Sequence, residues 1–209
     1  IAIVGQSGGL VMALKRTLEE RGMDTGFAIT SGNEAGLTTA DYIHYFAQEP
    51  HTRLIICYLE SVRDPDNFLS ACRAAKKAGK PVLVVKLGSS DEGRAAAMAH
   101  TGALAGSVAA FDAIAGDAGV IRVKTLDDMI ETAEYFLHVP LPKGSRVGAI
   151  TVSGGLRGMM LDAADENGIE FPALSARTDK ALRELLGVGT IIGNPLDSGF
   201  AALTSKEVY

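Results

Sequence analysis

Short apolar runs alternate with longer amphipathic segments from the first residue to about residue 138. Five runs have the length and composition of buried strands, and they cover residues 1–5, 25–30, 53–60, 80–88 and 120–123. Each is followed by apolar positions at helical spacing, over about residues 10–22, 40–49, 65–78, 108–119 and 126–138. Repeated strand–helix units predict an α/β fold in which helices cover both faces of a parallel sheet.

A segment with two prolines and a glycine, residues 139–145, separates this region from a second strand–turn–helix pattern. Residues 146–152 form the expected strand, and a turn is expected at Asn194-Pro195, followed by the start of a helix. We therefore predict two domains, residues 1–141 and 145–209. The second is expected to be incomplete, because the residues that remain are too few for another five-stranded unit.

The sequence Ser-Gly-Gly-Leu follows the first strand of each predicted domain. The two copies are 146 residues apart (153 − 7), and Gly22 and Gly168 follow the two helices at the same separation. Such a turn leaves the N–H groups of the first helical turn, with the Ser hydroxyl, available to an anion. We expect two related phosphate-binding turns, Ser7, Gly8 and Gly9 in one and Ser153, Gly154 and Gly155 in the other. The alternative is convergent reuse of glycine turns.

Two further residues are candidates for chemistry. His100 lies in AAAMAHTGALAGS, a run of small residues without a core pattern, which suits contact with phosphate. Glu60 ends an apolar strand and is expected at the carboxyl edge of the sheet, where such folds bind ligands. A carboxylate bonded to one imidazole nitrogen fixes the tautomer and leaves the other nitrogen free as a nucleophile. The alternatives are a loop histidine without chemistry and a carboxylate that caps a helix.

Several segments together resemble one enzyme family. They are QSGGL, SGN, YLES, KPVLVVKLGSS, AHTGALAGS, AGVIRV, VSGGLRG and GNPLDSG. They are similar to the NDP-forming acyl-CoA synthetases of the succinyl-CoA synthetase superfamily, which include the ADP-forming acetyl-CoA synthetases. HTGALAG is the most specific part, and Gly5 is a departure, because the family usually has Ser there. The resemblance implies a flavodoxin-like, succinyl-CoA-synthetase-like domain followed by the start of a related one.

The resemblance also implies a reaction, in which acid, CoA and ATP are interconverted with acyl-CoA, ADP and phosphate through an acyl phosphate and a phosphohistidine. By motif, His100 would carry the phosphoryl group, Glu60 would orient it, and both Ser-Gly-Gly turns would face it. Ser31, Gly32 and Asn33 would lie near the acyl group or the pantetheine thiol.

The same resemblance places CoA, ATP or ADP, and Mg²⁺ largely on CoA-binding and ATP-grasp domains, in the same polypeptide or a partner subunit. This chain is expected to bind none of them wholly. Its substrate would be a small carboxylic acid, and the sequence does not specify which one.

The composition argues against two other classes of protein, nucleic-acid binders and membrane proteins. The chain has 209 residues, a formal net charge of −5 and 22% charged residues, without the basic run that a nucleic-acid binder needs. No apolar stretch approaches the ~20 residues that span a bilayer. Cys57 and Cys72 are expected to be core residues in a reducing compartment. These features favour a cytoplasmic enzyme segment with no metal site, nucleic acid or membrane partner, and we expect the enzyme to be oligomeric.

Two other functions compete with this interpretation. One is a non-catalytic, regulatory paralogue that binds phosphate or CoA, which would have no need of the nucleophile His100. The other is a flavin carrier, against which stand the absence of Trp and the 6% aromatic content.

Overall fold

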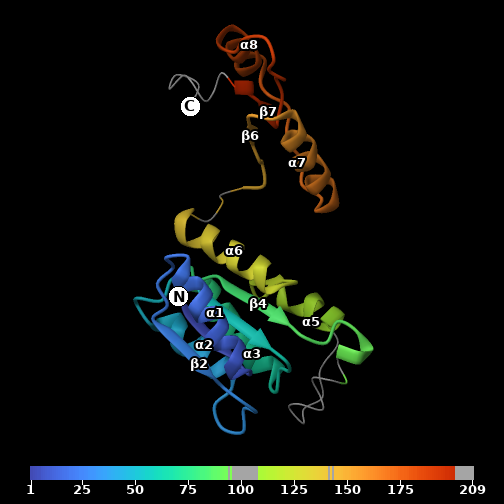
Figure 1. Ribbon diagram of the computed structural model, residues 1–209. Coiled ribbons are helices and arrows are strands. Elements are labelled where there is room, and N and C mark those ends of the chain that lie inside the picture. The colour runs from blue at the N-terminus through green and yellow to red at the C-terminus, as the bar shows by residue number, and fades with distance from the viewer. Residues whose placement is uncertain (94, 96–107, 141, 143, 201–209) are drawn as a thin grey trace. The chain divides into compact units, whose positions relative to one another are not determined.

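The computed structural model describes residues 1–93, 95, 108–140, 142 and 144–200. Its first compact unit, Ile1–Leu141, contains a parallel five-stranded sheet (Figure 1). The strands are β1 (Ala2–Gly5), β2 (Phe27–Thr30), β3 (Ile55–Leu59), β4 (Val82–Lys86) and β5 (Val120–Val123), in the order β2-β1-β3-β4-β5. All pairings are parallel. The predicted flavodoxin-like α/β fold is confirmed.

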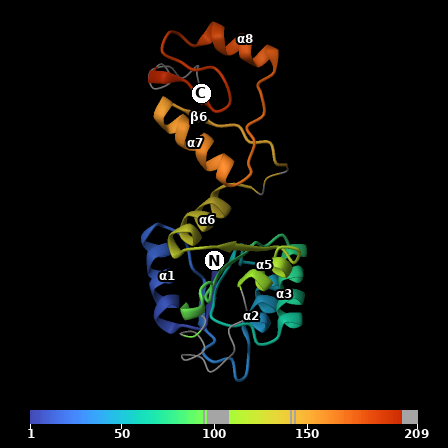
Figure 2. The ribbon, with the colours of Figure 1, turned by 90° about the vertical axis from the view of Figure 1, so that its right-hand side faces the viewer.

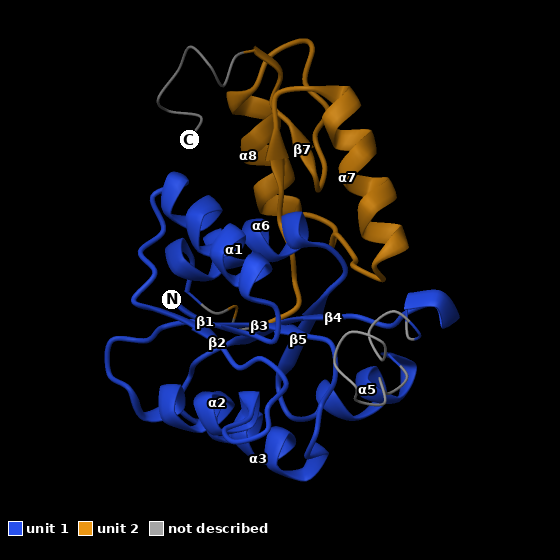
Figure 3. Cartoon of the chain, turned by 60° about the horizontal axis from the view of Figure 1, so that its bottom comes forward, with its two compact units in different colours: residues 1–141 blue, residues 142–209 orange. Residues whose placement is uncertain are grey.

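Helices cover both faces of this sheet, as Figures 2 and 3 show. One face packs against α1 (Gly8–Glu20) and α6 (Leu126–His138), and the other against α2 (Thr39–Gln48), α3 (Pro65–Lys77) and α5 (Val108–Ala115). Successive strand side chains point to opposite faces, so Ile3 joins the α1 cluster and Val4 joins the α2 cluster. Burial on both sides explains why β1, β3 and β4 read as continuous apolar runs.

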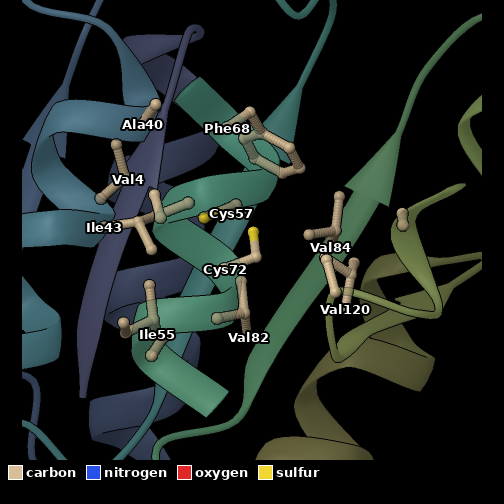
Figure 4. Close-up of a cluster of buried hydrophobic side chains, with 14 of the residues drawn as sticks. Val4, Ala40, Ile43, Ile55, Cys57, Phe68, Cys72, Val82, Val84 and Val120 are labelled. Carbon is tan, nitrogen blue, oxygen red and sulfur yellow. The ribbon is translucent and has the colours of Figure 1, made fainter. Parts of the chain in front are cut away.

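The two cysteines belong to the core under α2 and α3 (Figure 4). Cys57 lies on β3 and Cys72 on α3, and both are free, buried thiols. Burial raises the pKa of Cys72 to about 12 and that of Cys57 well above its ordinary value. Their predicted role as small core residues is confirmed.

The second compact unit, Pro142–Tyr209, contains α7 (Gly154–Glu166), α8 (Ala176–Leu185) and a two-stranded parallel sheet of β6 (Ile150–Thr151) and β7 (Leu196–Asp197). The strand expected over 146–152 is shorter than predicted. The sequence pattern did not predict α8, whose side chains are all at least partly exposed. After Asn194-Pro195 the chain first enters β7, which pairs with β6. The expected helix start follows β7, because a 3₁₀ turn begins at Gly199.

Helices α1 and α7 have matching lengths and ends. Each has 13 residues and begins directly after the Ser of its Ser-Gly-Gly turn. Each is followed by a glycine with positive φ, 78° at Gly22 and 63° at Gly168. In both, this N–H and the next donate to carbonyls of the last helical turn, a closure that favours glycine. The repeated strand–turn–helix pattern is therefore present in both units.

Candidate functional site

The carboxyl ends of β1 and β3 form the switch point of the five-stranded sheet. The two strands are neighbours, but the chain after β1 enters α1 on one face and the chain after β3 leads to α3 on the other. Open parallel sheets bind ligands outside the carboxyl ends of their strands at such a point. Residues 6–9 and 60–64 lie there.

Glu60 occupies the switch point, directly after β3, and is 4% exposed. Its N–H and that of Ser61 donate to Oε1 of Gln6, at 2.7 and 2.9 Å. Nε2 of Gln6 donates in turn to the Ser61 carbonyl, at 2.9 Å. The cap of the adjacent helix α3 is Asp64, whose side chain accepts from the Asn67 N–H at 3.0 Å. Glu60 is therefore not needed to cap that helix.

Lys86, at the end of β4, is a buried cation beside Glu60. Its Nζ donates to the Glu60 carbonyl at 2.8 Å and to the Leu87 carbonyl at 2.7 Å. Burial lowers the pKa of Lys86, and the negative charge of Glu60 opposes this effect. Sequence reasoning missed this residue. The available signal was a lysine inside the otherwise apolar run Pro81–Leu87. Burying an unpaired charge in a strand is energetically unfavourable, so such a lysine is expected to have a specific partner.

The first Ser-Gly-Gly turn follows Gln6 and begins α1. Ser7 is the N-cap, and its side chain makes no capping hydrogen bond. A Cβ at Gly9 would meet nothing within 4 Å, and one at Gly8 would be 3.6 Å from Thr30 Cγ2, an ordinary contact. The fold thus does not require glycine at either position. Within the described residues, no side chain at Gly8 or Gly9 covers the first-turn N–H groups, which suits an anion.

The second Ser-Gly-Gly turn has a carboxylate beside it. A Cβ at Gly154 would lie 3.3 Å from Oδ2 of Asp197, which is a buried residue at the end of β7. Oδ1 of Asp197 accepts from the Gly199 N–H at 3.0 Å. Asp197 therefore already places negative charge near the N-terminus of α7. The structure distinguishes two turns that the sequence pattern treats as equivalent.

The loop after β2 carries the third predicted group, and its main chain is bonded to β1, because the Ser31 N–H donates to the Gly5 carbonyl at 2.9 Å. Glu34, which sequence reasoning missed, organises the loop. Its buried carboxylate accepts from Ser31 Oγ and from the Thr39 N–H, each at 3.0 Å. Gly32 and Glu34 both have positive φ, 61° and 56°. Asn33 Oδ1 accepts from the Ala35 N–H, so these interactions fix the loop locally.

His100 lies outside the described residues. The sequence places it in the connection between β4 and α5. That connection begins at Leu87, whose N–H donates to the Leu59 carbonyl at 2.8 Å. The segment with His100 therefore starts at the same edge of the sheet as Glu60.

A pocket of about 500 Å³ lies at the opposite, amino edge of the sheet. Its basic lining residues are Arg53, Lys80 and His138. Lys80 Nζ donates to the carbonyls of Phe46 and Glu49, and Arg53 donates to the Leu137 carbonyl at 3.0 Å. These cations already compensate the C-terminal ends of α2 and α6, where helix dipoles disfavour an anion. We therefore place the candidate site at the carboxyl edge.

Within the described residues, no group of three or more His, Cys, Asp or Glu side chains could hold a metal ion. The same part of the chain contains no helix with the length and apolar character needed to cross a bilayer.

Comparisons with known proteins agree on one family. A family model for the succinyl-CoA ligase like flavodoxin domain matches residues 1–136. The chain is 35% identical to the acetate–CoA ligase [ADP-forming] II subunit alpha of Pyrococcus furiosus, covering 100% of this chain and 45% of that protein. It is 32% identical to a trans-feruloyl-CoA synthase of an unknown prokaryotic organism, covering 100% of this chain and 30% of that protein.

Among solved structures, the dinucleotide forming acetyl-coenzyme A synthetase 1 of Ca. Korarchaeum cryptofilum, in complex with phosphate and ADP, matches with a TM-score of 0.86 at 26% identity. The match covers 95% of this chain and 43% of that one. The chain thus spans less than half the length of each of these relatives.

Proposed function

The chain belongs to the succinyl-CoA ligase like flavodoxin domain family, and on this basis we propose that it is the phosphoryl-accepting part of an ADP-forming acyl-CoA synthetase. Its relatives include ADP-forming ligases for acetate and for 4-hydroxybutyrate. The proposal covers one segment of the reaction, because the chain matches only part of each relative.

The proposed reaction has three balanced steps. Phosphate attacks the thioester carbon of acyl-CoA, which releases CoA and leaves an acyl phosphate. A ring nitrogen of His100 then attacks phosphorus, the carboxylate leaves with the electrons of the broken P–O bond, and phosphohistidine forms. Transfer of the phosphoryl group to ADP gives ATP and restores His100. The reverse sequence makes acyl-CoA.

The observation that carries this proposal is the buried carboxylate of Glu60 at the switch point, next to the N-terminus of α1, which has glycine at its first two positions and no side-chain cap from Ser7. Glu60 would accept a hydrogen bond from one imidazole nitrogen and stabilise the positive charge that develops as the other nitrogen attacks. Ser7, Gly8 and Gly9 would bind the phosphoryl oxygens through first-turn N–H groups. The proposed site thus has two parts in adjacent loops, a carboxylate that orients the nucleophilic histidine and a site that binds the phosphoryl oxygens.

The remaining groups have supporting roles in the proposal. Ser31, Gly32 and Asn33 would border the acyl group or the CoA thiol, and Ser153, Gly154 and Gly155 would form the second phosphate turn once the charge of Asp197 is compensated. CoA-binding and ATP-grasp domains, fused or on a partner subunit, would supply the CoA and nucleotide sites, with Mg²⁺ on the nucleotide. We expect the complete enzyme to be cytoplasmic and oligomeric, and the two free, buried cysteines fit a reducing compartment.

The test is phosphoryl labelling of the complete enzyme. With acyl-CoA and labelled phosphate, the wild-type enzyme should acquire label that is labile in acid and stable in base, as phosphohistidine is. His100→Ala should acquire none, and Glu60→Gln should be labelled roughly 10²-fold more slowly while unfolding at the same temperature. Label that persists in His100→Ala would contradict the assignment. A wild-type enzyme without label would favour the non-catalytic paralogue.

A further inference from the structure

The main chain of Glu60 is held on both sides by side chains that come from the ends of the two strands flanking β3. Gln6 directly follows β1, and its Oε1 accepts from the Glu60 N–H at 2.7 Å. From β4, Lys86 Nζ donates to the Glu60 carbonyl at 2.8 Å. We infer that Gln6 and Lys86 are positioning residues that fix the Glu60 carboxylate for its role in phosphoryl transfer. This inference rests on the proposed function of Glu60.

These hydrogen bonds restrain Glu60, whose carboxylate has to point toward the histidine in the proposed reaction. A loop after a strand usually takes its hydrogen bonds from its own turn or from solvent. Here the loop at Glu60 takes three bonds from Gln6, two at N–H groups and one at the Ser61 carbonyl, and a further one from Lys86. Both side chains are 6% exposed. Restraint at N–H and C=O leaves the Glu60 peptide little freedom to rotate, which fixes the direction of its Cα–Cβ bond.

A buried ammonium has an energetic cost that calls for a reason. Removing a lysine from water disfavours its charged form, and apolar residues commonly replace buried ions without loss of stability. Lys86 remains in a strand that is otherwise apolar and binds the main chain at two loop origins, Glu60 and Leu87. Leu87 begins the connection that contains His100. Lys86 thus ties the loop of Glu60 to the origin of the segment with the proposed nucleophile.

The chain contains a matched control for Lys86. Lys80 begins the same strand segment at the opposite edge of the sheet, and its Nζ also donates to two main-chain carbonyls, those of Phe46 and Glu49. Lys80→Met and Lys86→Met therefore remove the same type of side chain and the same number of bonds to the main chain. Only the second removal affects the proposed site.

The experiment is a double-mutant cycle in the complete synthetase, measured at steady state with acyl-CoA, phosphate and ADP. Lys86→Met should lower kcat roughly tenfold or more, with the KM for acyl-CoA changed by less than about twofold. In the Glu60→Gln background the same substitution should lower kcat no further, because a positioning residue has nothing left to position. Lys80→Met should keep the wild-type kcat. Gln6→Met should repeat the pattern of Lys86→Met, and it decides the question if Lys86→Met does not fold.

Two results would overturn the inference. Variants at Lys86 and Gln6 with kcat within about twofold of wild type would show that these bonds are structural only. Effects that multiply with that of Glu60→Gln would show an action independent of Glu60, such as direct contact of Lys86 with phosphate. In both cases a slow Glu60→Gln enzyme would leave the proposed function standing, whereas a Glu60→Gln enzyme with wild-type kcat would contradict both.

Discussion

Glycine serves two different purposes at the first turn of this chain. At Gly5, a Cβ would lie 2.7 Å from Val11 Cγ2 and 3.3 Å from Tyr58 Cβ, so glycine is needed for the close packing of α1 on β1 and β3. This packing gives a physical reason for Gly5 where the resembled family usually has Ser. At Gly9, by contrast, a Cβ would meet nothing within 4 Å among the described residues. Packing therefore does not require glycine there, and the reason that we propose for it is a phosphoryl group bound by the first-turn N–H groups.

Gly9→Ala separates these two purposes experimentally. Alanine favours a helix over glycine by up to about 1 kcal/mol, so the free energy of unfolding should stay equal or rise. Phosphohistidine formation should nevertheless slow roughly tenfold or more, because the methyl group displaces the phosphoryl oxygens from the first-turn N–H groups. Denaturant unfolding and single-turnover labelling measure the two effects. Gly158→Ala, inside α7 and equally free of close contacts, is the control and should leave labelling unchanged. Wild-type labelling by Gly9→Ala would contradict the phosphate role of this turn.

A site residue can be predicted from the sequence when its role follows from its neighbours in the sequence, and not when it depends on contacts made only in the fold. Glu60 was predictable because a single carboxylate ends an apolar strand, and the edge at which it lies follows from the parallel topology. Gln6 has the same sequence separation from strand β1, but its function depends on β3 lying beside β1. Local patterns do not give that strand order. Glu34 was missed for a similar reason, because its partners Ser31 and Thr39 meet only when the loop closes.

At the scale of elements, the start of α2, which follows the loop of Ser31–Asn33, should make the stability of the fold depend on pH. The Thr38 N–H and hydroxyl both donate to Asp41 Oδ2, each at 2.8 Å. The main-chain bond, followed by the hydroxyl bond, lowers the pKa of Asp41. A carboxyl whose pKa is lower in the folded chain stabilises the fold above its unfolded pKa of ~3.9. That contribution is lost as the pH falls through the lowered folded value.

Asp41→Ala should therefore reduce the free energy of unfolding by about 1 kcal/mol at pH 7, the usual contribution of a helix cap. The difference from wild type should shrink below about pH 4 as Asp41 becomes protonated in the folded chain. Urea titrations at pH 7, 5, 4 and 3 measure this trend. Asp66→Ala serves as the control, because Asp66 is an exposed carboxylate in the first turn of α3 and the helix is capped by Asp64. A constant difference at all pH values would assign the loss to packing.

The five strands of the first unit each lie inside a predicted segment. In β1, β3 and β4 every residue is buried, which gives an uninterrupted apolar run. The edge strands β2 and β5 are partly exposed, and they were predicted from their short apolar sequences between helical segments. Helix α8 has no fully buried residue and few apolar residues, and although these lie on one face of the helix, the prediction missed it. Its N-cap Ser175, which accepts from the Thr178 N–H at 3.1 Å, was the available signal.

At the scale of the whole molecule, the two units differ in the cores that they form. In the first, two buried clusters cover the two faces of the sheet and include large side chains such as Phe46, Leu14 and Met129. In the described part of the second, the buried apolar residues are Ala164, Leu186 and Leu196. Met159 and Ile150 remain exposed at 68% and 58%. Stability depends mainly on buried apolar area, so the units should not be equally stable.

A fragment of residues 1–141 should therefore fold alone, with a dispersed amide NMR spectrum and a single cooperative unfolding transition. A fragment of residues 142–209 should show narrow amide dispersion and no cooperative transition, because three buried apolar side chains cannot offset its conformational entropy. Cooperative unfolding of 142–209 alone would contradict this argument.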